Sequence, residues 1–154
     1  MPTATDEQLQ WIERVATYLA RDGMPPIAGR VLGWLMISEP AEQSAAEIAA
    51  AVGASRASLT TTLRLLMAAG FVTRQGRAGE RTAYYRIDDD AWGRVVRAQV
   101  ASIGTFQSIA EDGLRLVGRK SSRREGLNAA SDVFAWMAEV FENAPPMPRR
   151  DGSR

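Results

Sequence analysis

Residues 55–86 hold the side chains with the clearest capacity for binding chemistry, because small hydroxyl residues there are interspersed with arginines. Six arginines and a single acidic residue, Glu80, give this segment a net charge of +5, whereas the whole chain carries +1, which leaves −4 for the remainder. A positive block on a nearly neutral chain favours a polyanionic partner, with duplex DNA as the leading candidate. A solvated, arginine-rich surface without a partner is the alternative. The six arginines are Arg56, Arg64, Arg74, Arg77, Arg81 and Arg86.

The first part of this segment has the spacing of a helix-turn-helix. A capping box at Ser44-x-x-Glu47 opens a helix over residues 48–52, Gly53 supplies the turn, and a second helix is expected over residues 55–69. The apolar stripe of the second helix faces inward, which leaves a polar face suited to a major groove. A plain helical hairpin inside a core is the competing interpretation. The predicted DNA contacts of the second helix are Ser55, Arg56, Ser58, Thr60, Thr61 and Arg64.

Directly after this helix, the sequence predicts a β-hairpin. Residues 71–75 and 81–87 have strand character, and the glycines within residues 76–80 allow a turn between them. A hairpin next to a helix-turn-helix indicates a winged helix, whose arginines lie along the DNA backbone or in the minor groove. The predicted wing contacts are Arg74, Arg77 and Arg81, whereas Arg86 is assigned to a salt bridge at the rim.

The remaining chain is expected to be helical, which makes the fold class mainly α with α+β character. We expect a winged helix-turn-helix lobe with a two-stranded wing, followed by a helical dimerisation region. The predicted domains are residues 5–87 for DNA binding, 88–143 for dimerisation and 144–154 for a disordered tail. Two further capping boxes, Thr5-x-x-Gln8 and Ser122-x-x-Glu125, begin the first and last helices, and Asp88 or Asp89 caps a long helix that extends to about residue 117.

The long helix carries a heptad repeat that predicts a homodimer. Its seam advances by alternating steps of four and three residues from Trp92 to Val117, and the last helix repeats this spacing from Leu127 to Phe141. A two-fold dimer would present two recognition helices to successive major grooves of a pseudo-palindrome. An intramolecular hairpin between the two helices is the alternative. The predicted dimer contacts are Trp92, Val96, Ile103, Phe106, Phe134, Met137 and Phe141.

The composition argues against most other classes of protein. The chain has no Cys and no His, which excludes disulfides and Cys-ligated zinc and removes the commonest general base. We therefore predict no catalytic residue, no cofactor, no metal site and no enzyme activity. No apolar run is long enough for a membrane span and no secretory signal opens the chain, so a cytoplasmic protein without a membrane partner is expected. A winged-helix adaptor between proteins remains open as an alternative function.

Four stretches of the chain together resemble the GbsR/MarR-like transcriptional regulators. The resemblance covers residues 5–90 well and the C-terminal helices only in outline. It implies a homodimeric repressor or activator that binds operator DNA and is often modulated by a small-molecule effector. The four stretches are PPIAGRVLGWL (residues 25–35), EQSAAEI (42–48), SRASL (55–59) and GERTAYYRI (79–87).

The resemblance also directs attention to the wing tip and to an effector site. Many MarR wings contain an acidic residue that braces the tip, and here only Glu80-Arg81 offers a comparable pair. Cysteine-based sensing is impossible in this chain. Aromatic side chains are the candidates for an effector site at the junction with the dimer helices, although ordinary core packing is the favoured interpretation of each one. These candidates are Trp11, Tyr18, Trp34, Trp92 and Phe106.

Overall fold

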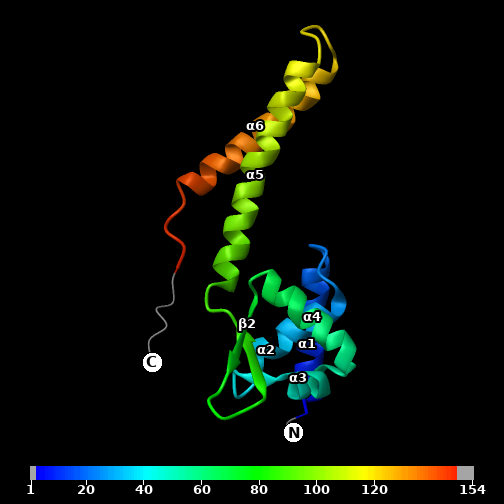
Figure 1. Ribbon diagram of the computed structural model, residues 1–154. Coiled ribbons are helices and arrows are strands. Elements are labelled where there is room, and N and C mark those ends of the chain that lie inside the picture. The colour runs from blue at the N-terminus through cyan, green and yellow to red at the C-terminus, as the bar shows by residue number, and fades with distance from the viewer. Residues whose placement is uncertain (1–2, 149–154) are drawn as a thin grey trace. The chain divides into compact units, whose positions relative to one another are not determined.

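A computed structural model describes residues 3–148 and confirms the predicted fold class, since the chain is mostly helical with one small antiparallel sheet (Figure 1). The chain divides into two compact units, and the division falls between Ala91 and Trp92. The elements are α1 (Asp6–Ala20), α2 (Pro26–Ile37), β1 (Gln43–Ser44), α3 (Ala45–Val52), α4 (Arg56–Ala68), β2 (Val72–Gly76), β3 (Ala83–Ile87), α5 (Ala91–Leu116) and α6 (Arg123–Glu142).

The first unit is built on close contact between α1 and α2. Gly29 makes this contact possible, because a Cβ at this position would lie 2.7 Å from the Cα atom of Ala16. Glu13 of α1 and Arg30 of α2 add a salt bridge with two hydrogen bonds across the same pair of helices. The centre of the unit is mostly apolar, because each helix buries a stripe of aliphatic side chains there. Its fully buried members include Ile12, Val31, Leu32, Ile48, Leu59 and Leu66.

The sheet has three strands in the order β1-β3-β2, all antiparallel. The predicted hairpin is present as β2 and β3, with Val72 opposite Ile87 and Gly76 opposite Ala83. Strand β1 was not predicted, because two residues are too short to show a period of two. Its pairing to β3 places the strand that leads into α3 directly beside the hairpin.

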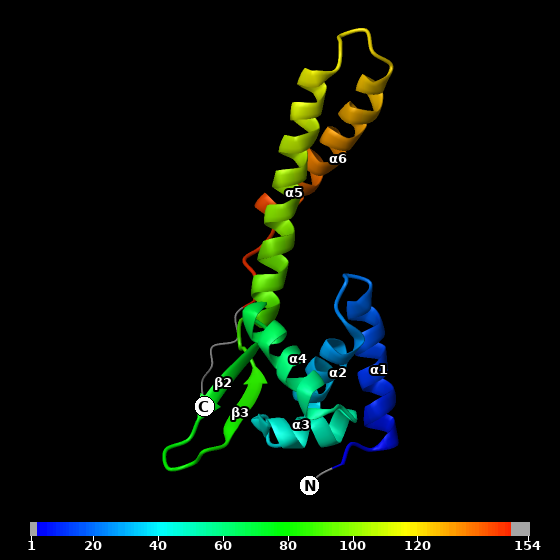
Figure 2. The ribbon, with the colours of Figure 1, turned by 45° about the vertical axis from the view of Figure 1, so that its right-hand side comes forward.

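The second unit is a helical hairpin of α5 and α6 that runs antiparallel (Figure 2). The rings of Phe106 and Phe134 lie 4.4 Å apart between their centroids. The Arg124 side chain donates hydrogen bonds to the carbonyl groups of Leu114 and Val117, at 2.8 and 3.3 Å. No residue of α6 is buried, and several of its large apolar side chains remain exposed. None of the helices within residues 3–148 is both long enough and apolar enough to span a bilayer.

The predicted start of the last helix is wrong. Ser122 precedes α6 but has helical backbone angles and makes no side-chain capping hydrogen bond, so the third capping box is absent. The hydroxyl of the preceding Ser121 accepts the Arg123 amide instead, because the chain already turns before residue 122. The long helix begins at Ala91, after a turn in which the Asp88 carboxylate accepts the amide of Asp90. Residues 144–148 form no helix or strand, and the rest of the predicted disordered tail lies outside the described residues.

Candidate nucleic-acid interface

The turn between α3 and α4 has the geometry that the sequence predicts for a helix-turn-helix. Gly53 ends α3 in the left-handed region, with φ of 66° and ψ of 32°, and its amide donates to the Ala49 carbonyl. The amide of Ala54 donates to the same carbonyl at 3.0 Å. Ser55 then caps α4, because its hydroxyl oxygen accepts the Ser58 amide at 3.2 Å. The second helix therefore starts at a fixed angle to the first.

One face of α4 packs into the core and the opposite face is open to solvent. The buried positions are those of an inward helical stripe, at the expected spacing of three and four residues. They are Leu59, Thr62, Leu63 and Leu66. All six predicted contact residues of this helix are exposed, and they are Ser55, Arg56, Ser58, Thr60, Thr61 and Arg64.

The hydroxyl groups on this face differ in whether their hydrogen is free to donate to a phosphate. The hydroxyl of Thr60 donates to the Arg56 carbonyl at 2.9 Å, and that of Thr61 donates to the Ala57 carbonyl at 3.3 Å. Each of these hydroxyls must rotate away from its own helix before it can donate to an acceptor elsewhere. The Ser55 oxygen accepts a backbone amide, so its hydrogen remains available for an anion at the start of α4.

The basic residues fall into two groups. Arg56, Arg64, Arg74 and Arg81 are exposed, and none of them forms a salt bridge within residues 3–148. Arg77 and Arg86 are engaged inside the protein. Arg86 pairs with Asp89, as predicted for a rim salt bridge. The guanidinium of Arg77 donates to the Glu42 carboxylate at 2.9 Å, and this hydrogen bond raises the pKa of Arg77 above its ordinary value.

Sequence reasoning missed two side chains that contact the wing arginine. Glu42 precedes β1, and Tyr84 lies on β3 with its ring centroid 3.8 Å from the guanidinium carbon of Arg77. The Tyr84 hydroxyl donates to Glu80 at 2.8 Å, and this hydrogen bond raises the pKa of Tyr84. The predicted brace between Glu80 and Arg81 is thus replaced by Glu80 with Tyr84. Arg77 and Glu42 are 35 positions apart, so the spacing of neighbouring residues in the sequence does not predict their contact.

The second unit exposes apolar side chains along both helices. Of the seven predicted dimer contacts, Ile103 and Phe134 are half-buried, and the other five are exposed. An additional stripe on α6, at spacing of three and four, was missed by the sequence reasoning: Val133, Trp136 and Val140 are 57%, 62% and 48% exposed. An open groove of about 550 Å³ lies between α5 and the residues that follow α6, with Val96, Val100 and Phe141 in its lining.

A cluster of acidic side chains that could hold a metal ion would indicate a different kind of site. Within residues 3–148, no group of three or more acidic side chains is placed to hold a metal ion. The candidate binding surfaces are the exposed polar face of α4, the exposed arginines of the hairpin and the exposed apolar side chains of α5 and α6.

Comparisons with known proteins agree with this geometry. Residues 22–81 match the family model of the MarR family, and residues 90–144 match that of MmpR5-like MarR family transcriptional regulators. The chain is 31% identical over 142 residues to the HTH-type transcriptional regulator MmpR5 of Mycobacterium tuberculosis, with 92% of this chain and 86% of that protein covered.

A crystal structure of a transcriptional regulator shares the fold, with a TM-score of 0.68 and 30% identity over 89% of this chain and 94% of that one. MarR family regulators bind operator DNA and act as dimers, and they are not enzymes. This chain belongs to the MarR family of transcriptional regulators, with its helical C-terminal region of the MmpR5-like kind.

Proposed function

We propose that this protein is a homodimeric regulator that binds a specific DNA operator through α4 in the major groove and through the β2–β3 hairpin beside it. The observation that carries this proposal is the open polar face of α4, on which hydroxyl groups and free arginines are gathered on an otherwise acidic chain. Guanidinium and hydroxyl groups in this arrangement bind phosphate oxygens and base edges. An adaptor that bound another protein would be expected to present an apolar or acidic face.

The residues of α4 take different parts in the proposed complex. Ser55, Arg56 and Ser58 surround the start of the helix, where free amides and the helix dipole attract a phosphate. Arg64 lies two turns further on and is assigned to a base edge, where a bidentate contact to guanine is favoured. Thr60 and Thr61 contribute after their hydroxyls rotate toward the DNA. Arg74 and Arg81 of the hairpin are assigned to the backbone or the minor groove.

The apolar surface of α5 and α6 supports the dimer. The intramolecular hairpin leaves large apolar side chains exposed on both helices, and exposed apolar side chains at heptad spacing favour a partner helix. We assign the second copy of the chain to this surface, with the predicted contacts Trp92, Val96, Ile103, Phe106, Phe134, Met137 and Phe141. Val133, Trp136 and Val140 extend it.

The proposed operator is a pseudo-palindrome, because a two-fold dimer reads the same half-site twice. Its half-sites are expected about one helical turn, roughly 10 bp, apart. On the family resemblance alone we propose repression as the direction of control, with the cytoplasm as the location. Selection of bound duplexes from a random library by the purified protein tests the operator: an inverted repeat should be enriched, and recovery of unrelated sequences would contradict specific binding.

Two finer points rest on the sequence resemblance. Closeness to GbsR proteins stays a prediction, since the matched C-terminal family is MmpR5-like. A small-molecule effector is also part of the proposal, but Trp34 is withdrawn from the candidate aromatics because its side chain is only 3% exposed in the core of the first unit. A screen of small molecules tests whether an effector exists. Tryptophan fluorescence reports binding, and release of operator DNA reports the effect on regulation.

A further inference from the structure

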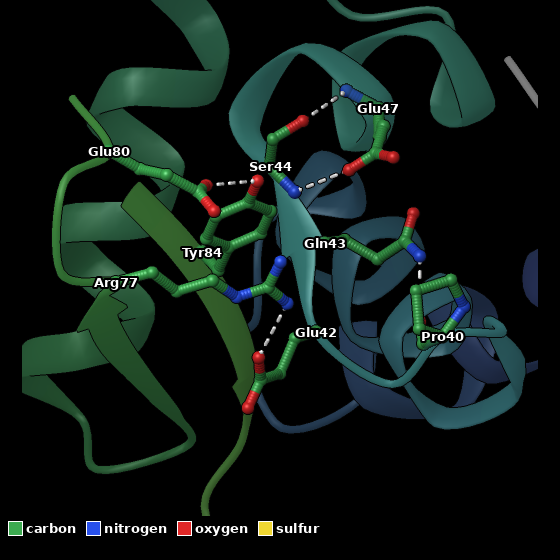
Figure 3. A network of polar contacts seen from close by, with 8 residues as sticks. All are labelled: Pro40, Glu42, Gln43, Ser44, Glu47, Arg77, Glu80 and Tyr84. Carbon is green, nitrogen blue, oxygen red and sulfur yellow. Dashed lines mark hydrogen bonds and ion pairs between the residues drawn. The ribbon is translucent and has the colours of Figure 1, made fainter. Parts of the chain in front are cut away.

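The arginines of the hairpin are not equivalent. Arg74 and Arg81 extend into solvent and form no salt bridge within the part of the chain that the structure describes. Arg77, at the turn, instead lies back over the sheet, where it donates to Glu42 and stacks on the ring of Tyr84 (Figure 3). Its side chain is 45% exposed and that of Glu42 is 31% exposed, so the pair is accessible but not free.

Tyr84 provides a firm base for this contact. It lies on β3, the central strand, where it pairs with Ser44 of β1 on one side and with Gln75 of β2 on the other. Its hydroxyl donates to Glu80, whose amide donates to the Arg77 carbonyl at 3.0 Å and closes the turn. Glu42, Arg77, Glu80 and Tyr84 therefore form one connected cluster, which we call the wing clamp (Figure 3).

The other end of the wing clamp is fixed to the helix-turn-helix. Glu42 is followed by Gln43, whose side chain is fully buried and donates to the Pro40 carbonyl at 2.7 Å. Ser44 comes next and caps α3 in a reciprocal capping box with Glu47 (Figure 3). The carboxylate that holds Arg77 thus belongs to the segment that starts the first helix of the helix-turn-helix.

The charges around Arg77 make it a poor site for a phosphate. Glu42 accepts its hydrogen bond and Glu80 lies close enough to add to the same local field. A phosphate that approached Arg77 would meet two carboxylates, and like charges at short range repel. Neither Arg74 nor Arg81 forms a salt bridge with any residue that the structure describes. The positive charge that a DNA backbone would meet on the hairpin therefore resides on these two residues.

We propose that Arg77 is a positioning residue and not a DNA contact: the wing clamp holds the hairpin turn to the segment that begins α3, so that Arg74 and Arg81 are presented at a fixed place beside the recognition helix. This inference rests on the proposed DNA-binding function. A hairpin ordered before binding loses less conformational freedom when it meets DNA, so the clamp increases affinity without touching the ligand.

Salt dependence separates a positioning residue from a phosphate contact. The affinity for a random-sequence duplex is measured at several salt concentrations for the wild type, Glu42→Gln, Arg77→Gln, the double variant and Arg81→Gln as the matched control. Loss of the clamp should weaken binding about two- to fivefold, the size of a surface ion pair, and the double variant should lose no more than either single variant. The slope of log K against log [salt] should stay unchanged for Arg77→Gln, whereas Arg81→Gln should lower it by about 0.9 for each protomer that binds.

Two results of the DNA-binding measurement would overturn the inference. One is a shallower salt slope for Arg77→Gln, matching that of Arg81→Gln, because Arg77 would then neutralise a phosphate. The other is tighter binding by Glu42→Gln, because Glu42 would then compete with DNA for Arg77.

A second measurement, made without DNA, tests whether the wing clamp holds the hairpin. Amide hydrogen exchange of the full chain should be faster across residues 74–85 in both Glu42→Gln and Arg77→Gln, and unchanged in Arg81→Gln. Unchanged exchange in all three variants would show that the clamp does not hold the hairpin. A wild type that bound no duplex would instead overturn the proposed function, and the exchange rates would still report on the hairpin alone.

Discussion

Arg64 has the position expected of a base-reading side chain. It is exposed, it lies more than two turns into α4, and no salt bridge within residues 3–148 holds it. Removal of one bidentate contact to guanine costs about 1–3 kcal/mol of discrimination against the wrong base. Arg64→Ala should therefore weaken binding to the selected operator more than binding to random duplex, as measured by fluorescence anisotropy on both. An equal loss on the two duplexes would assign Arg64 to the DNA backbone.

The hydrogen bond of Tyr84 makes the stability of the folded protein depend on pH in the alkaline range. Its hydrogen bond to Glu80 raises the pKa of Tyr84 above the ordinary value of 10.0 in the folded protein. The stabilising contact is therefore complete below pH 10 and is lost as the pH rises through the raised pKa. The wild type should melt at a higher temperature than Tyr84→Phe below pH 10, and this difference should vanish at higher pH. A difference that persisted unchanged above the raised pKa would contradict the role of the phenol.

For single residues, the sequence predicts which side chains of a helix are exposed better than it predicts which side chains contact one another in the folded protein. The exposure of Thr60 and Thr61 follows from helical spacing, because the buried residues of α4 define the opposite face. The partner of Arg77 does not follow, since Glu42 reaches it only through the pairing of β1 with β3. Side chains joined by tertiary structure leave no periodic signal in one sequence.

At the scale of elements, Gly53 determines the junction of α3 and α4. Its φ of 66° lies in the left-handed region, and a Cβ there would meet no atom within 4 Å, so the cost of a side chain is one of backbone strain. Gly53→Ala should lower the free energy of unfolding in urea by about 1–2 kcal/mol, and Gly53→Asn by less. Gly76→Ala is the control, because Gly76 also has open space and its φ is not in the left-handed region. An equal effect of the two alanine substitutions would contradict the argument.

The capping boxes show where element prediction succeeds and where it fails. Thr5 with Gln8 and Ser44 with Glu47 form both reciprocal hydrogen bonds, as their spacing predicts. Ser122 has the same spacing but is already helical, so its side chain cannot reach back to the amides. The pattern is necessary for a capping box, and the backbone angles of the preceding turn decide whether it forms.

For the whole molecule, the central question is whether two copies associate through α5 and α6. Trp136→Asp with Val140→Asp places two charges on an exposed apolar stripe of α6, away from the Phe106–Phe134 contact that holds the hairpin. Light scattering should give the mass of one chain, 16.8 kDa, for this variant and twice that value for the wild type. Asn128→Asp adds an acidic group at another exposed position of α6 and should leave the dimer intact. A dimeric double variant would place the interface elsewhere.

The most direct test of the account is the affinity of the wild type for duplex DNA as salt is varied. With about three to four phosphate-facing arginines on each protomer, a dimer should show log K falling linearly with log [salt] at a slope of about −5 to −7. Binding that is independent of salt, or no binding to any duplex at low ionic strength, would contradict the assignment of α4 and the hairpin as a DNA-binding surface.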